Sequence, residues 1–342
     1  MSEITFVGDT FIDRDFKISL PYKKLVINLE SPITKSDRAA PNKINLRTQA
    51  ETIEGCEGFM PSAACLANNH ISDFLDQGLE DTLSYLNDKN IAYFGAGLNQ
   101  EEALAPIYID VDGVKIGLIG AACLSTSPIA ATTTEAGVAI NDIENIERSV
   151  KKARTHGAEI VIVNYHWGAE EVGLPKPSDI NLGRQTIDVG ADMVIGHHAH
   201  CIHPYEIYKG KYIFYGLGNF IFDDFQAGAL YSNEKNRFLS EFNKKQEYWN
   251  RRSLAVTLDV KSGAVKVDIL AQKDGEVFIH KKSTNNYFKK IRQGRFYEKK
   301  FKLVYFLAKI KSILFRFLRN PKIPRLKHIL GIVAISKSTE FK

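Results

Sequence analysis

The chain has 342 residues, 44% hydrophobic and 25% charged, which is enough for one large domain with additions or for two domains of ordinary size. These fractions are typical of a soluble folded protein, and they exclude wholesale disorder and a protein with many membrane spans. The charge is uneven. Residues 281–342 carry 18 Lys and Arg against 2 Asp and Glu, a net charge of +16, whereas residues 1–280 carry 27 against 38, a net charge of −11. We therefore expect a main domain over 1–280 and a basic extension over 281–342, with different partners.

The first residues and the cysteines bear on the cellular compartment. The chain enters a strand-like run within three residues, without a basic segment followed by an apolar stretch of signal-peptide length. The four cysteines are far apart and form no Cys-x-x-Cys pair, which is typical of reduced structural thiols. We therefore expect a cytoplasmic protein.

Short β-branched runs alternate with helical patterns along most of the chain. In order, the sequence predicts strands at 3–8, 24–30 and 64–70, a helix at 76–90, a strand at 91–97, a hairpin at 106–122, a helix at 142–157, a strand at 158–168, a helix at 181–190, a strand at 191–196, and hairpins at 201–223 and 253–271. Residues 224–252 lose the apolar pattern and are expected to form a loop or an insertion. This order predicts an α/β protein with layered mixed sheets and helices on the outside.

Side chains able to bind metals follow five of the predicted strands. They are Asp9, Glu30, Asn69 with His70, His166, and the group His197, His198 and His200. Ligands of layered α/β proteins bind where loops leave the carboxyl ends of strands, so we expect these side chains to converge. Carboxylate, amide and imidazole donors without a thiolate favour Mn, Fe or Zn in a hydrolytic site over a structural zinc site.

The segment VIGHHAH, residues 194–200, holds three of the nine histidines. If the segment is extended, alternate residues face the same way, so His198 and His200 can reach one metal or a close pair. His197 then points to the other side. Metal ligation and a supporting hydrogen bond to a ligand are equally open for it.

Six motifs occur together in the order and spacing of a known family. They are FVGDTFIDR, INLESPIT, LANNHISDFLDQGLEDTLSYL, NYHWGAEE, DVGADMVIGHHAH and YGLGNFIFD, and the match covers residues 4 to about 223. On these motifs the chain resembles the CapA family of capsule or poly-gamma-glutamate biosynthesis proteins, whose fold is similar to that of the calcineurin-like metallophosphoesterases. The resemblance implies a four-layer α-β-β-α sandwich with mixed sheets.

The same resemblance implies roles for single residues. The positions that match metal ligands are Asp9, Asn69, His166, His198 and His200, and Glu30 replaces the usual bridging aspartate. His70 matches the acid that protonates the leaving oxygen, and Arg14 matches an arginine suited to a phosphate or carboxylate. Glu170 matches a glutamate that orients a histidine. For Asn219, a role in the site and a place in a tight structural turn are equally open.

One position departs from the metallophosphoesterase pattern. The usual first motif is Asp-x-His, but this chain has Phe11 in place of the histidine, and phenylalanine cannot bind a metal. One metal position is therefore short of a ligand, and one ion or two both stay open.

The resemblance implies a function in the biosynthesis of a surface polymer of poly-gamma-glutamate type, together with other biosynthesis proteins. It implies a metal-dependent hydrolase or transferase in which activated water attacks a phosphate or acyl centre. Phe11 favours a second interpretation, in which the protein is a non-catalytic assembly subunit at the membrane surface that keeps the site for binding.

The basic extension contains a predicted helix over 298–320. Lys302, Lys309 and Arg316 are seven residues apart and share one face, although Lys311 falls opposite. The segment carries too much charge to span a bilayer. Binding of 296–320 to an anionic membrane, on the inner face, and packing on the negative main domain are equally open. Nucleic acid ranks third, because aromatic residues interleaved with glycine are missing.

Overall fold

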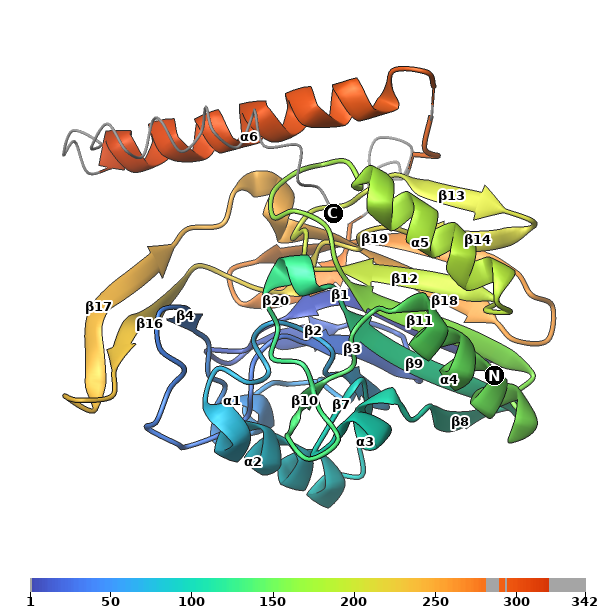
Figure 1. The fold of residues 1–342 in the computed structure, drawn as a ribbon, viewed down its shortest axis with the longest axis horizontal. Coiled ribbons are helices and arrows are strands. Elements are labelled where there is room, and N and C mark those ends of the chain that lie inside the picture. The colour runs from blue at the N-terminus through green and yellow to red at the C-terminus, as the bar shows by residue number, and fades with distance from the viewer. Residues whose placement is uncertain (1, 281–288, 293, 320–342) are drawn as a thin grey trace. The chain divides into compact units, whose positions relative to one another are not determined.

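The structure is a computed structural model that describes residues 2–280, 289–292 and 294–319. It consists of two compact units, residues 1–291 and the segment that begins at Arg292. The first unit contains two large β-sheets with helices on their outer sides (Figure 1).

The first sheet has nine strands in the order β2-β20-β19-β18-β1-β3-β5-β6, with β15 also paired to β1. The bounds are β1 (Glu3–Thr10), β2 (Lys17–Ser19), β3 (Leu25–Leu29), β5 (Ala63–Cys65), β6 (Ala92–Phe94), β15 (Asn219–Ile221), β18 (Arg252–Asp259), β19 (Val265–Lys273) and β20 (Glu276–Ile279). Strands β1, β3, β5 and β6 run parallel, so their carboxyl ends lie at one edge of the sheet.

The second sheet has six strands in the order β13-β14-β12-β11-β9-β8. The bounds are β8 (Ile107–Val111), β9 (Val114–Ala122), β11 (Ile160–His166), β12 (Met193–His197), β13 (Tyr205–Tyr208) and β14 (Lys211–Phe214). Strands β9, β11, β12 and β14 are parallel and the other two pairs are antiparallel, so this sheet is mixed, as predicted.

The remaining elements are short or lie outside the two large sheets. They are β4 (Ile44–Asn45), β7 (Ala96–Gly97), β10 (Gly137–Val138), β16 (Phe225–Ser232), β17 (Arg237–Lys244), α1 (Ala50–Glu54), α2 (Leu75–Asp88), α3 (Gln100–Leu104), α4 (Ile143–Thr155), α5 (Pro177–Asp188), and the 3-10 turns η1 (Leu124–Thr126) and η2 (Tyr248–Arg251). Strands β17, β16 and β4 form a small antiparallel sheet, and β7 pairs with β10.

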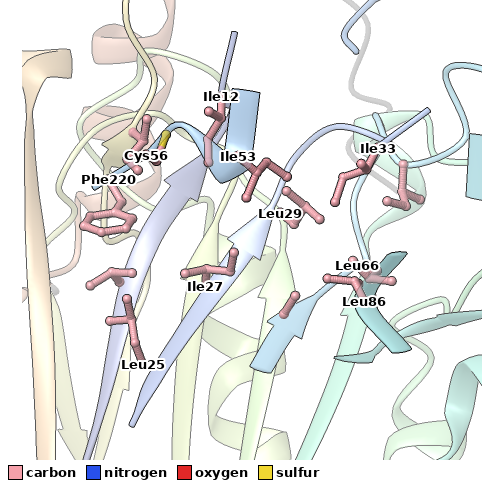
Figure 2. Close-up of a cluster of buried hydrophobic side chains, with 14 of the residues drawn as sticks. Ile12, Leu25, Ile27, Leu29, Ile33, Ile53, Cys56, Leu66, Leu86 and Phe220 are labelled. Atoms are coloured by element: carbon pink, nitrogen blue, oxygen red, sulfur yellow. The ribbon is translucent and has the colours of Figure 1, made fainter. Parts of the chain in front are cut away.

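The central strands are buried on both faces, which makes the sandwich four layers deep. In β3, Leu25, Ile27 and Leu29 pack in an outer cluster that includes Leu86 of α2 (Figure 2). Val26, which points the other way, packs in a second cluster together with residues of the opposite sheet. One cluster therefore lies between the first sheet and its helices and the other lies between the sheets, which confirms the predicted α-β-β-α sandwich.

Two predictions of local structure need correction. Of the loop or insertion expected over 224–252, the structure has an insertion, because 225–244 form the antiparallel hairpin of β16 and β17. Strand β17 is mostly exposed and β16 is largely half-buried, so the pair lacks a clear apolar alternation. Strand β4 pairs with β16 on its other edge. The helix expected at 181–190 begins earlier, at Pro177, since proline suits the first helical turn.

The second unit contains α6 (Tyr297–Arg319), which confirms a basic helix near the predicted bounds of 298–320. Residue 320, residues 281–288 and the side chain of Arg316 lie outside the described part of the chain. Among the described residues, no helix combines the length and the apolar character needed to cross a membrane.

Candidate metal centre

Five strand ends from the two large sheets meet at one place. Asp9 lies at the end of β1, Glu30 directly follows β3, and Asn69 lies in the loop after β5. From the second sheet, β11 ends at His166 and β12 ends at His197. The backbone N–H of His198 lies 3.2 Å from Oδ2 of Asp9, which joins the two sheets at this point.

Asp9 is a buried carboxylate at the centre of the group. Its Oδ1 accepts a hydrogen bond from Nδ2 of Asn28 at 2.9 Å and lies 3.4 Å from Nδ1 of His197. Its Oδ2 lies 3.3 Å from Nδ1 of His200. Burial alone raises the pKa of Asp9, but the hydrogen bonds from His197 and His200 outweigh it and hold the pKa well below the usual range. The carboxylate of Asp9 is therefore ionised.

Glu30 is equally buried, but the histidines near it are too distant for hydrogen bonds. Neither carboxylate oxygen has a hydrogen-bond partner among the described residues. Its Oε1 lies 3.5 Å from Nε2 of His166 and 3.7 Å from Nε2 of His200. Burial, with the nearby charge of Asp9, raises the pKa of Glu30 well above its usual value. A buried carboxylate of this kind calls for a cation.

Two groups of donor atoms share Glu30. One consists of Glu30, His166 and His198, and the other of Asp9, Glu30 and His200; in each, one ligand atom per residue lies within 4.8 Å of the others. Together with the unpartnered oxygens of Glu30, these groups fit one or two divalent ions.

The two histidines of the HxH pair reach the site by a route that the sequence reasoning missed. Neither is in an extended segment, because φ is 83° at His198 and 55° at His200, both in the left-handed region. The expectation that strand alternation puts them on one side is therefore wrong. They follow the end of β12 in a sharp turn, and their rings are 6.2 Å apart.

The imidazoles differ in protonation. Burial lowers the pKa of His198 to about 4, and burial followed by the charge of His198 lowers the pKa of His166 well below its usual value. Both rings are therefore neutral, which is the form that binds metals. His200 behaves differently: burial opposes protonation, but Glu30 and Asp9 outweigh it and raise the pKa of His200 to about 10.

The loop after β5 adds an amide and a histidine. Oδ1 of Asn69 lies 2.7 Å from Nε2 of His166, so Asn69 is next to the ligand groups. Nδ1 of His70 lies 2.7 Å from Oδ2 of Asp73, a buried carboxylate. Asp73 also pairs with Nζ of Lys43 and accepts the backbone N–H of Leu46 at 2.6 Å.

Of the other predicted site residues, Asn219 and Glu170 interact with histidines of the ligand groups, whereas Arg14 does not. Oδ1 of Asn219 lies 2.9 Å from Nδ1 of His200, which favours the role of Asn219 in the site over the plain turn. For Glu170, desolvation raises the pKa, but the charges of His198 and His200 outweigh it and lower the pKa. Arg14 lies apart from the ligand groups: it contacts Asp13, Asp223 and the backbone of Asp224.

Three further residues belong to the site, and sequence reasoning did not select them. Asn28 and Asp73 had a weak signal, since each is a polar residue inside or beside an apolar run. Asn250 had none, because it lies in η2, within the segment expected to be a loop. It is fully buried, and its Nδ2 donates to the backbone oxygen of His200 at 3.1 Å.

Phe11 occupies an apolar pocket of its own. Its ring centre lies 5.4 Å from those of both Phe222 and Phe225. The ring of Phe222 in turn packs against His200 at 4.8 Å. Where the metallophosphoesterase pattern has a histidine, this chain therefore places an aromatic layer beside the ligands.

Residues 3–224 match the family model described as bacterial capsule synthesis protein PGA_cap. The chain belongs to this family. One relative of the chain is the PGA biosynthesis protein CapA of Bacillus subtilis. It is 37% identical over 199 residues, which cover 57% of this chain and 52% of the relative. A probable polyglutamine synthesis accessory protein of Mycobacterium tuberculosis is 32% identical over 213 residues, covering 59% and 56%. The family member thus spans about half the length of these relatives.

Among solved structures, the chain is similar to the calcineurin-like phosphoesterase YfkN of Bacillus subtilis. The two are 15% identical, the match covers 81% of this chain and 88% of the other, and the TM-score is 0.38.

Proposed function

We propose that the chain acts in capsule or poly-gamma-glutamate biosynthesis as a metal-dependent hydrolase or transferase that works on a phosphate or acyl centre. The observation that carries this proposal is the Glu30 carboxylate, buried and without a hydrogen-bond partner among the described residues, inside two groups of ligand atoms. The names of the relatives from Bacillus and Mycobacterium support the setting and indicate other biosynthesis proteins as partners.

The donor set limits the metal that we propose. Imidazole and carboxylate donors, with an amide beside them, favour Mn, Fe or Zn. The residues that would hold it are Asp9, Glu30, His166, His198 and His200, with Asn69 beside His166. A bound divalent ion supplies a Lewis acid that polarises a phosphoryl or carbonyl oxygen and makes water a better nucleophile.

His70 is the proton donor in this proposal. Its Nδ1 is engaged by Asp73, which leaves Nε2 as the nitrogen that faces a leaving-group oxygen. Asp73 is held in turn by Lys43 and by the backbone N–H of Leu46, so the His70 ring has a fixed orientation. A fixed ring with one available nitrogen is what general acid catalysis requires.

Metal content tests the first half of the proposal. The variant His198→Ala/His200→Ala should lose bound metal in elemental analysis of purified protein. His156→Ala is the matched control, because His156 is an exposed histidine at the end of α4, and it should keep the metal. Unchanged metal content in the double variant would contradict the proposal.

Turnover tests the second half. A panel of phosphodiesters, phosphomonoesters and γ-glutamyl peptides is assayed with and without Mn²⁺. We expect Mn-dependent hydrolysis of at least one class, and we expect His70→Ala and Asp73→Asn to lose it while their metal content stays that of the wild type.

Phe11 supports a second candidate function, a non-catalytic assembly subunit that uses the site only to bind. Its ring lies in the aromatic cluster with Phe222 and Phe225, so it supplies no donor where the metallophosphoesterase pattern has one. A protein that holds metal but turns over no member of the panel would favour this function.

A further inference from the structure

We propose that α6 is a membrane-binding helix that lies in the surface of an anionic bilayer. The proposal rests on α6 itself and is independent of the metal centre. Helix α6 has 23 residues, of which seven are basic and one, Glu298, is acidic. A charged helix with one apolar stripe is typical of segments that lie along a membrane instead of crossing it.

An apolar stripe runs along α6, and three of its four residues are exposed. At about 100° per residue, Leu303, Leu307, Ile310 and Leu314 fall within an arc of about 60° along α6. The exposed fractions are 57% for Leu303, 53% for Leu307 and 56% for Leu314. By the same helical geometry, Phe301 lies on the opposite face of the helix.

Lysines border this stripe on both sides. By the same helical geometry, Lys300 and Lys311 lie along one border, and Lys299, Lys302 and Lys309 lie along the other and behind it. All five residues are exposed. Lysine stems can lie along the hydrocarbon boundary while their ammonium groups reach lipid headgroups, so both borders would contact an anionic surface at once.

The arrangement favours a lipid surface over the other two partners. Nucleic acid is recognised by basic groups together with aromatic faces, but the centre of this stripe is aliphatic. A second copy of α6 would have to bring the bordering lysines of both helices close together, with little acid to compensate, since Glu298 already pairs with Lys302 at 2.8 Å. An anionic bilayer offers both hydrocarbon for the leucines and negative charge for the lysines.

Vesicle flotation with the full chain tests the proposal. The protein should float with vesicles of mixed phosphatidylglycerol and phosphatidylcholine and bind phosphatidylcholine vesicles at least about tenfold less, because each lysine near an anionic surface contributes about fivefold. Leu303→Glu/Leu307→Glu should abolish flotation. The matched control is Leu124→Glu/Leu239→Glu, two leucines of the first unit that are 64% and 55% exposed, and it should float like the wild type.

A second pair of variants leaves the apolar stripe intact. Lys299→Glu/Lys309→Glu should weaken binding at least about 25-fold. Lys151→Glu/Lys273→Glu, in which both side chains are more than two-thirds exposed in the first unit, should change it little. Circular dichroism and metal content check that each variant stays folded. Equal binding to both vesicle types, flotation of the Leu303/Leu307 variant, or binding of duplex DNA without binding of vesicles would overturn the proposal.

Discussion

Glu30→Gln should stabilise the chelator-treated protein and weaken the metal-loaded one. Both oxygens of Glu30 are buried without hydrogen-bond partners among the described residues, and the Asp9 carboxylate is close by. Gln has nearly the same shape and no charge, so the variant removes the cost of burying a second carboxylate. The gain comes from removing the buried charge beside Asp9: each unit by which the pKa of Glu30 is raised corresponds to about 1.4 kcal/mol. A gain of 1 kcal/mol raises the melting temperature of a domain of this size by roughly 2 °C, so we expect the melting temperature in chelator to rise by a few degrees.

Metal should reverse this order. A ligand at 100 times its dissociation constant stabilises the folded state by about 2.7 kcal/mol. Glu30 is the residue shared by both ligand groups. The Glu30→Gln protein should therefore bind the ion much more weakly than the wild type and gain little of this stabilisation. The assay is thermal unfolding followed by circular dichroism, for both proteins, in chelator and then in a Mn²⁺ series.

Asp73→Asn is the matched control. Asp73 is as buried as Glu30, but its carboxylate is engaged by His70, Lys43 and the N–H of Leu46. Breaking a buried pair costs about 3–5 kcal/mol, so this variant should be less stable with and without metal. If Glu30→Gln melted below the wild type in chelator, or gained as much from Mn²⁺, the assignment of Glu30 as the shared metal ligand would be wrong.

Three further changes test other parts of the structure. Asn250→Ala removes the hydrogen bond to the His200 backbone oxygen and should weaken metal affinity about 10- to 100-fold in calorimetric titrations; unchanged affinity would show that this contact does not hold the loop. Gly8→Ala would place a Cβ 1.8 Å from the carbonyl oxygen of Gly218, so the free energy of unfolding, measured by urea unfolding, should fall by about 3 kcal/mol. A variant as stable as the wild type would contradict this close approach. Burial raises the pKa of Asp179 to about 6 from an ordinary 3.8, so the folded state binds the extra proton and stability falls as pH rises through this window. Asp179→Asn should remove that slope in urea unfolding at a series of pH values and gain about 1–3 kcal/mol at pH 7, whereas an unchanged slope would contradict the assignment.

The layered core was predictable because it follows from the local spacing of apolar residues along the strands. In β3, the alternation of Leu25, Val26 and Ile27 between two clusters follows from the period of a strand, and the continuous apolar run indicates burial on both faces. The β16–β17 hairpin was not predictable in this way. Its strands are held by backbone pairing, and β17 leaves most of its side chains exposed, so no clear apolar period marks the pair.

The convergence of ligand residues followed from their positions at strand ends, but the details did not. The route of His198 and His200 depends on two left-handed backbone angles that no local pattern indicates. Asn250 reaches His200 from 50 residues away, from within the segment 224–252 that the sequence predicts to be a loop or an insertion. Contacts of this kind depend on tertiary packing, and a single sequence does not encode them in any periodic form.

The location of the ligand groups has a mechanical consequence. Each combines one or two carboxylates at strand ends of the first sheet with one or two imidazoles at strand ends of the second. A cation held there would cross-link the two sheets of the sandwich at the edge where their loops emerge. Its removal should therefore speed amide hydrogen exchange along the facing ends of β1 and β12, well beyond the coordinating side chains themselves.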